Sequence, residues 1–472
     1  MSLRAAGVMQ QSVQSHLQSY LQGFVQSIMQ DTADAIRRAL SRGPATAAAL
    51  AAQLGVSVAT VSRRVAALGA DVVRAQGGRA ARLCLRDTRR GVPEVPVYRV
   101  GEDGRVSRLG LLVPVRPDGW VMQGEDGTAV HHEGLPWWIA DMRPAGYLGR
   151  AYAGHHAVHL GLSPRLSEWS DTDHLRALLA HGHDAPGNLL LGDLARERQL
   201  SATWIARPDE GEVYAHLART AAQGGEPGTS AGGEQPKFPA YIETDHGGAH
   251  VLCKFTAAEA GPVPQRWADL LLAEHHALET LRAAGIEAAR SQVIDHDGRR
   301  FLRVERFDRV GPLGRRALLS LATLDAEFVG SATPLWPSSA ARLAAAGVIT
   351  REAAEGAALL HAFGTLIGNT DMHAGNLSFI GAGRPYGLAP AYDMLPMGLA
   401  PAAGGTLPDT LAAPYLRPEV PPAVWRRALG LAETFLARVR ADDRWSARWA
   451  PCIEALAVHL ETARVRIGRL GD

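Results

Sequence analysis

The spacing of apolar residues predicts a helical start to the chain. Over 11–30 the apolar side chains recur every three or four residues, with glutamine and serine between them, which is the pattern of an amphipathic helix. We expect this helix, within 1–30, to pack on the next domain, and a dimerisation helix is the alternative. Three more helices are predicted at 33–41, 46–54 and 57–68.

Two short β-rich runs follow these helices. They cover 71–74 and 81–86 and are joined by two glycines. Three helices followed by a two-stranded ribbon predict a winged helix-turn-helix over 31–90, and 48–64 resembles bacterial helix-turn-helix regulators. This domain holds eleven arginines and four aspartates, a local charge of +7, whereas the whole chain carries +1.

The local positive charge favours DNA as the partner of this domain. A third helix in the major groove can read bases through arginine, and arginines of the wing can neutralise phosphates. A solvated arginine face on a protein-binding domain is the alternative. The predicted DNA-binding residues are Ser57, Thr60, Ser62, Arg63, Arg64, Arg74 and Arg79.

Further along, the pattern changes to strands and then to helices. Residues 92–130 predict a linker with short strands. Strands are predicted next at 238–243, 249–255, 291–295 and 301–307, with one helix at 264–284. From 339 onward the chain is mostly helical, interrupted over 368–393. We therefore expect an α+β fold with two lobes, a β-rich lobe over 96–310 and a helical lobe over 311–472.

Composition excludes several classes of protein. The 472 residues suggest about three domains. No run approaches the ~20 apolar residues that span a bilayer, so we expect no membrane partner and a cytoplasmic location. Three scattered cysteines exclude a disulfide framework.

Only two of the 49 basic residues are lysines, Lys237 and Lys254, which marks these two positions as places where a compact ammonium is required.

A catalytic pattern lies in the helical lobe. Asp371 and Asn376 have the five-residue spacing of the protein-kinase catalytic loop, in which the aspartate accepts a hydroxyl proton and the asparagine holds Mg²⁺. Asp393 follows seventeen residues later, where kinases place a second metal ligand. We therefore predict Asn376 and Asp393 as the Mg²⁺ ligands.

A phosphate-binding pattern lies in the β-rich lobe. The loop 230–237 contains Gly232 and Gly233, whose backbone can approach phosphates closely, and a flexible linker is the alternative. Lys254 lies in the middle of an apolar strand, where an ammonium needs an anionic partner. Glu274 on the following helix is the predicted partner.

These motifs together resemble the HipA family of bacterial serine/threonine kinases, the toxins of type II toxin–antitoxin systems. The resemblance covers about 96–460 and rests on SAGGEQPK, VLCKF, FLRVERFDR, GNTDMHAGN and YDM. LPWWIADMRP and the fused N-terminal domain are similar to the subgroup called YjjJ.

The resemblance implies a role for each matching residue. Asp371 would be the catalytic base and His373 would support its loop. Lys237 and Lys254 would hold ATP phosphates. The backbone of Glu305 and Phe307 would receive the adenine. Ser230 or Thr229 would be the autophosphorylated residue, although the sequence of the loop departs from the family pattern by an apparent insertion.

The expected function is transfer of the ATP γ-phosphate, with Mg²⁺, to a serine or threonine of a protein such as an aminoacyl-tRNA synthetase or a translation factor. Members of this family are silenced by a separate DNA-binding antitoxin. Because this chain carries its own predicted DNA-binding domain, we expect it either to bind such an antitoxin or to need none. Two alternatives stay open: a transcription regulator whose kinase lobes only sense nucleotide, and a Mg²⁺-dependent DNA nuclease.

Overall fold

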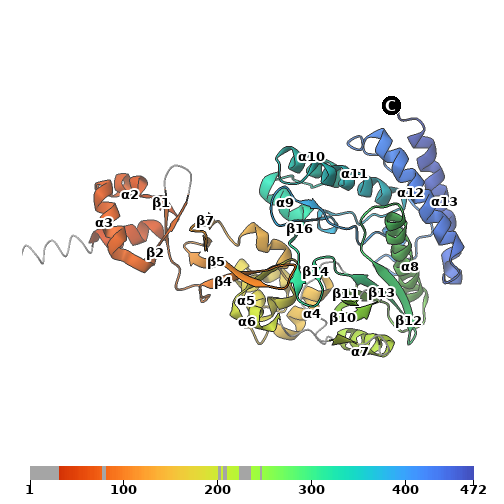
Figure 1. The fold of residues 1–472 in the computed structure, drawn as a ribbon, viewed down its shortest axis with the longest axis horizontal. Helices are drawn as coiled ribbons and strands as arrows, with labels where there is room; N and C mark the ends of the chain where they lie inside the picture. The colour runs from red at the N-terminus through yellow and green to blue at the C-terminus, as the bar shows by residue number, and fades with distance from the viewer. Residues whose placement is uncertain are drawn as a thin grey trace, which may run out of the picture. The chain divides into compact units, whose positions relative to one another are not determined.

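The computed structural model describes residues 31–76, 81–199, 204–205, 210–222, 235–244 and 247–471. The predicted helix at 11–30 lies outside these residues. Contacts divide the chain into two compact units, one of residues up to 97 with 108–136, the other of 98–107 with 137–472 (Figure 1). No helix in the described part is long and apolar enough to cross a membrane.

The first unit begins with the predicted helices and ribbon. Residues 31–40 are helical, and β1 (Ala45–Thr46), α2 (Ala47–Leu54), α3 (Val58–Leu68), β2 (Val72–Ala75) and β3 (Arg82–Leu85) follow. The strands form a sheet in the order β1-β3-β2. Gly55 ends α2 with φ of +65°, a conformation that glycine adopts without strain. Val61 and Val65 of α3 are buried against Leu50, which leaves the opposite face of α3 exposed.

An antiparallel meander completes the first unit. It consists of β5 (Val106–Val115), β6 (Gly119–Gly124) and β7 (Ala129–His132), and β4 (Val95–Val100) precedes it. Val113 and Val121 pack against Val73 and Cys84 of the ribbon. This shared core groups 108–136 with the ribbon of the N-terminal domain, which differs from the predicted boundary at 96.

The second unit opens with a small, mainly helical segment. It contains η2 (Trp137–Met142), α4 (Gly146–His156), α5 (Asp171–His181), β8 (Leu189–Leu191) and α6 (Asp193–Arg198). Ser170 and Asp173 form a reciprocal capping box at the start of α5. We call residues 137–199 the middle segment.

A five-stranded sheet follows, in the order β12-β13-β11-β10-β9, with a helix on each face. Its members are β9 (Trp204–Ile205), β10 (Lys237–Thr244), β11 (Gly247–Phe255), β12 (Ser291–His296) and β13 (Arg299–Glu305). The helices are α7 (Glu210–Ala222) and α8 (Pro262–Ala283) (Figure 1). Phe301 of β13 packs with Tyr214 of α7, and Leu302 packs with Leu271 of α8, because successive strand residues face opposite ways.

The rest of the unit is mostly helical, as the sequence predicts. After β14 (Arg309–Val310) and β15 (Gly314–Arg315) come β16 (Leu318–Ser320), α9 (Leu321–Phe328), α10 (Trp336–Ala345) and α11 (Arg351–Leu366). Next are η6 (Ala374–Asn376), β17 (Ser378–Ile380), β18 (Gly387–Leu388), α12 (Pro422–Ala441) and α13 (Ala450–Ile467). Buried side chains such as Phe363, Phe435 and Trp449 form one large core here.

Candidate active site

The Lys254 side chain faces α8, because successive residues of a strand face opposite sides of the sheet. Its neighbours in β11, Cys253 and Phe255, face α7, so Lys254 faces the other helix. Its Nζ donates to both carboxylate oxygens of Glu274 on α8, at 2.7 and 2.6 Å, and to Oδ1 of Asp393 at 2.6 Å. The predicted lysine–glutamate partners are therefore in direct contact, and the predicted metal ligand Asp393 joins them.

Lys254 lies between two carboxylates in a buried place, and burial together with the nearby Asp393 raises the pKa of Glu274 even though Lys254 opposes the rise. The Lys254 side chain is 6% exposed and that of Glu274 is 1% exposed, whereas Asp393 is 25% exposed. Burial alone would lower the pKa of Lys254, but Asp393 and Glu274 raise it above its ordinary value. Burial would raise the pKa of Asp393, yet Lys254 holds it below its usual range. Lys254 is therefore a cation and Asp393 an anion at neutral pH.

Lys237 lies beside this cluster. It is buried and lies directly opposite Lys254 in the pairing of β10 with β11. Its positive charge also lowers the pKa of Asp393. The two lysines of the chain are therefore neighbours at one anionic site.

The loop with Asp371 and Asn376 follows α11. The amide nitrogen Nδ2 of Asn376 donates to the backbone oxygen of Asp371 at 2.9 Å, which leaves Oδ1 of Asn376 for another partner. Asp371 is exposed at the surface of this loop. The loop therefore places the exposed Asp371 near the Asn376 amide, whose orientation is fixed by its hydrogen bond.

Asn369 connects the two acidic loops, a role that the sequence reasoning missed. Its Oδ1 accepts the backbone N–H of Asp371 at 3.0 Å, and its Nδ2 donates to the backbone oxygen of Asp393 at 3.5 Å. Asn369 is buried. Because the chain has only three asparagines, its presence two residues before Asp371 was a usable signal.

His373 and Tyr392 form hydrogen bonds that fix the loop of Asp371 and Asn376. The ring nitrogen Nδ1 of His373 accepts the backbone N–H of Gly375 at 3.0 Å, and its backbone oxygen accepts Nε1–H of Trp336 at 2.9 Å. The Tyr392 hydroxyl donates to the backbone oxygen of Gly375 at 2.9 Å. These contacts give His373 the supporting position that the resemblance implies.

Asp393 itself has a strained backbone. Its φ is +56°, which is uncommon for a residue with a side chain. Such conformations occur where surrounding contacts fix them, often at functional sites. Here the contact between Asp393 and Lys254 holds the carboxylate in place.

The donor set at Asn376 and Asp393 fits Mg²⁺. An amide oxygen and a carboxylate are hard ligands, and Mg²⁺ usually takes one or two protein oxygens and completes its shell with water and phosphate. The described residues contain no cluster of three His, Cys, Asp or Glu side chains that could hold a metal. A Mg²⁺ ion held by these two residues would keep positions for water and phosphate oxygens.

The predicted hinge is only in part available to a ligand. β13 ends at Glu305, two residues earlier than predicted. The backbone N–H of Glu305 donates to the Arg290 oxygen at 2.8 Å. Phe307 lies in the turn that follows, with its ring 5.6 Å from that of Tyr392. An adenine contact at Glu305 would therefore use its carbonyl.

Several predicted residues lie outside the described part of the chain. These are Gly232 and Gly233 of the glycine-rich loop, the phosphorylation candidates Ser230 and Thr229, and Arg79 of the wing.

The predicted DNA-binding side chains lie on α3 and β2 of the first unit. Ser57 caps α3 by accepting the Thr60 N–H at 3.1 Å. Ser62, Arg63 and Arg74 are exposed, and Thr60 and Arg64 are half-buried. Within the described residues neither Arg63 nor Arg74 forms an ion pair, unlike Arg37, which bonds Asp34 and Asp71.

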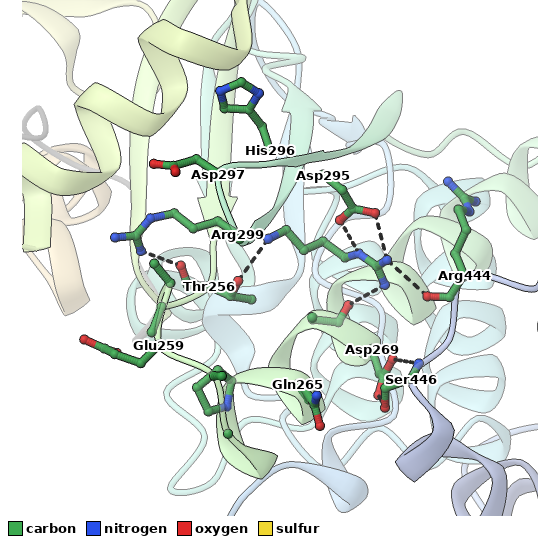
Figure 2. A pocket seen from close by; sticks show the side chains of 18 of the residues that line it. Thr256, Glu259, Gln265, Asp269, Asp295, His296, Asp297, Arg299, Arg444 and Ser446 are labelled. Carbon is green, nitrogen blue, oxygen red and sulfur yellow. Dashed lines mark hydrogen bonds and ion pairs between the residues drawn. The ribbon is translucent and has the colours of Figure 1, made fainter.

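A separate cavity of about 630 Å³ lies where the loop before α8, the β12–β13 turn and residues 444–446 meet (Figure 2). Arg300 donates to both oxygens of Asp295, at 2.7 and 2.9 Å. Asp269 of α8 accepts the backbone N–H and the hydroxyl of Ser446, at 2.9 and 2.6 Å. None of the predicted site residues that the structure describes lines this cavity. Its hydrogen bonds connect the first half of α8 to Arg300 and Ser446.

Two solved structures are similar to parts of this chain. A solved HipA from Shewanella oneidensis MR-1, in a complex with HipB and operator DNA, matches with a TM-score of 0.44 and 14% identity, over 79% of this chain and 97% of that one. The Helicobacter pylori proinflammatory kinase CtkA matches with a TM-score of 0.35 and 13% identity, over 51% of this chain and 95% of that one.

Sequence comparison is more specific. Residues 92–200 match the family model of the YjjJ-like toxin middle domain, and 229–427 match the HipA-like C-terminal domain. Toxin YjjJ of Escherichia coli (strain K12) is 36% identical over 429 residues, which are 89% of this chain and 95% of that protein. The chain therefore belongs to the YjjJ-like toxins, with a HipA-like C-terminal domain.

Proposed function

We propose that this toxin is an ATP-dependent protein serine/threonine kinase. The observation that carries the proposal is the buried contact of Lys254 with Glu274 and Asp393, next to a loop that contains Asp371 and Asn376. In protein kinases a strand lysine pairs with a helix glutamate, and the lysine, a catalytic-loop pair and a second metal ligand surround the phosphates. The same residue types occur in this chain, and Lys254 contacts Glu274 and Asp393 directly.

Each residue has one task in the transfer. Lys254, held by Glu274, binds the ATP phosphates, and Asn376 and Asp393 would hold Mg²⁺, whose charge would offset that of the phosphates. The substrate hydroxyl oxygen forms a bond to the γ-phosphorus as the bond from that phosphorus to ADP breaks. Asp371 accepts the hydroxyl proton.

DNA is the proposed partner of the first unit. α3 presents Ser62 and Arg63 on the face opposite its buried valines, and Arg74 projects from the ribbon. A recognition helix with an exposed arginine that forms no ion pair in the described part of the chain is suited to the major groove. We propose that the chain combines a winged helix-turn-helix DNA-binding domain with the kinase, and that a separate antitoxin is therefore dispensable.

The test uses the purified full chain with Mg²⁺ and γ-labelled ATP, with and without cell lysate, beside Asp371→Ala. We expect label on this protein or on a lysate protein, lost in the variant. ATP binding without any labelling would favour the nucleotide-sensing regulator. Nicking of supercoiled plasmid without labelling would favour the nuclease.

A further inference from the structure

The middle segment contacts both sides of the candidate active site. In η2, the Asp141 carboxylate accepts the backbone N–H of Ser320 at 2.7 Å and its hydroxyl at 2.6 Å. In the same η2, Trp137 packs edge-to-face on Phe328, with ring centroids 5.3 Å apart. Ser320 caps the start of α9 and Phe328 is its last residue, so η2 holds both ends of this helix.

Asp141 is suited to the start of α9. Ser320 uses its hydroxyl to accept the Thr323 N–H at 3.1 Å and donates the hydroxyl proton to Asp141. A carboxylate at a helix N-terminus is stabilised by the exposed N–H groups and by the helix dipole. Burial raises the pKa of Asp141, and the hydrogen bonds from Ser320 oppose that rise.

From Ser320 the contacts continue to the catalytic loop. Ser320 lies opposite Ser378 in the pairing of β16 with β17. The hydroxyl of Ser378 is 2.7 Å from that of Tyr392, which donates to the backbone oxygen of Gly375 at 2.9 Å. Gly375 precedes the predicted metal ligand Asn376. Hydrogen bonds from Asp141 to Ser320 and from Ser378 through Tyr392 to Gly375 are therefore joined by the pairing of Ser320 with Ser378 across β16 and β17.

A second anchor of the middle segment reaches the predicted hinge. Arg306 directly follows the predicted hinge residue Glu305. Its guanidinium donates a hydrogen bond to the Asp184 carboxylate at 2.7 Å. Asp308 accepts from Arg306 at 3.1 Å and from the Gly187 backbone N–H at 3.0 Å. Burial would raise the pKa of Asp184, but Arg306 and Arg309 lower it, so the ion pair persists at neutral pH. The segment therefore holds both the hinge side and the catalytic-loop side of the site.

We infer that the middle segment is a brace for the active site, and that Asp141 is a positioning residue that acts through Ser320, Ser378 and Tyr392 on the loop of Asn376. The inference rests on the proposed kinase function for its kinetic consequence. Asp141 does not contact the reacting atoms or ATP. Its loss should therefore misplace the catalytic loop, which lowers kcat, and leave the KM for ATP nearly unchanged.

A double-mutant cycle in the full-length protein tests the brace. We expect Asp141→Asn and Ser320→Ala each to lower kcat roughly 10- to 100-fold, because a small misplacement of a catalytic group has an effect of that size. The double variant should lose less than the product of the two single losses, since both variants disturb the hydrogen bond from the Ser320 hydroxyl to Asp141. Asp118→Asn, in the exposed β5–β6 turn, is the matched control and should keep the wild-type kcat.

Hydrogen–deuterium exchange separates this inference from the proposed function. In Asp141→Asn the backbone amides of 372–380 should exchange faster than in the wild type, whether or not the protein transfers phosphate. If the wild type transfers no phosphate, the proposed function fails. The hydrogen–deuterium exchange of 372–380 then decides whether Asp141 positions this loop. If Asp141→Asn does not fold, Ser320→Ala and Tyr392→Phe replace it. Wild-type kcat together with wild-type exchange in these variants would overturn the inference, as would additive losses in the cycle.

Discussion

Lys254 and Asp393 are 139 residues apart in the chain, and their side chains are 2.6 Å apart in the structure. The lysine is shared between a helix carboxylate and this aspartate, so without nucleotide its single positive charge is divided between them. A phosphate group would compete for the same ammonium, and Mg²⁺ would compete for the same carboxylate. Nucleotide and metal should therefore bind more tightly together than separately.

Replacing the lysine tests this cluster. Lys254→Met would leave Glu274 and Asp393 without their cation in a buried place, and removing one partner of a buried ion pair typically costs about 3–5 kcal/mol. We expect a loss of that size in the free energy of unfolding, measured in urea, together with loss of ATP binding. Adding Glu274→Gln to this variant should restore part of the stability. Wild-type stability of Lys254→Met would contradict the electrostatic account.

Asn369→Ala should separate the two acidic loops. It removes the acceptor for the Asp371 N–H and the donor to the Asp393 oxygen. We expect kcat for phosphate transfer to fall roughly 10- to 100-fold, because both groups lose their fixed positions. Asn188→Ala, in the middle segment, is the matched control. Equal rates for Asn369→Ala and the wild type would show that Asn369 is not needed.

Stability should depend on pH through His361 of α11. Burial, assisted by Arg417, lowers its pKa from 6.5 to about 4. Between these values the unfolded chain binds a proton that the folded chain does not, so stability falls as pH drops from about 7 to about 4. His361→Leu should remove roughly 3 kcal/mol of this dependence. Urea titrations across this range would check it, with the exposed His155→Leu as control; an unchanged pH slope in His361→Leu would refute it.

DNA binding should depend on Arg63. If it reads a guanine, Arg63→Ala should weaken binding by about 1–3 kcal/mol and relax the sequence preference, whereas Arg74→Ala should weaken binding to all sequences and reduce the salt dependence. Selection from a random duplex library, followed by anisotropy titrations, measures both effects. Arg351→Ala, an exposed arginine of the second unit, should change neither. Absence of DNA binding by the wild type would contradict the proposed partner.

The sequence predicted much of the fold because hydrophobic spacing is local. α8 was expected over 264–284 and covers Pro262–Ala283. Strand alternation also explains why the pairing of Lys254 with Glu274 could be predicted: a charged residue in an apolar strand needs a partner on the face that it points to.

Contacts between distant segments could not be predicted in this way. Asp141 and Ser320 are 179 residues apart, and neither has a pattern of its own that indicates the other. The packing of Val113 on the ribbon was missed for the same reason, because a valine-rich strand does not specify which apolar surface it will cover.

The most direct test of the kinase account is the initial rate of transfer from γ-labelled ATP, measured with ATP affinity for the wild type, Asp371→Asn and the exposed Asp409→Asn control. The account predicts that Asp371→Asn binds ATP like the wild type and loses roughly 10²- to 10⁴-fold in rate, as expected for loss of a general base, while Asp409→Asn keeps both. Transfer by Asp371→Asn at the wild-type rate, or ATP binding by the wild type with no transfer to any protein, would contradict it.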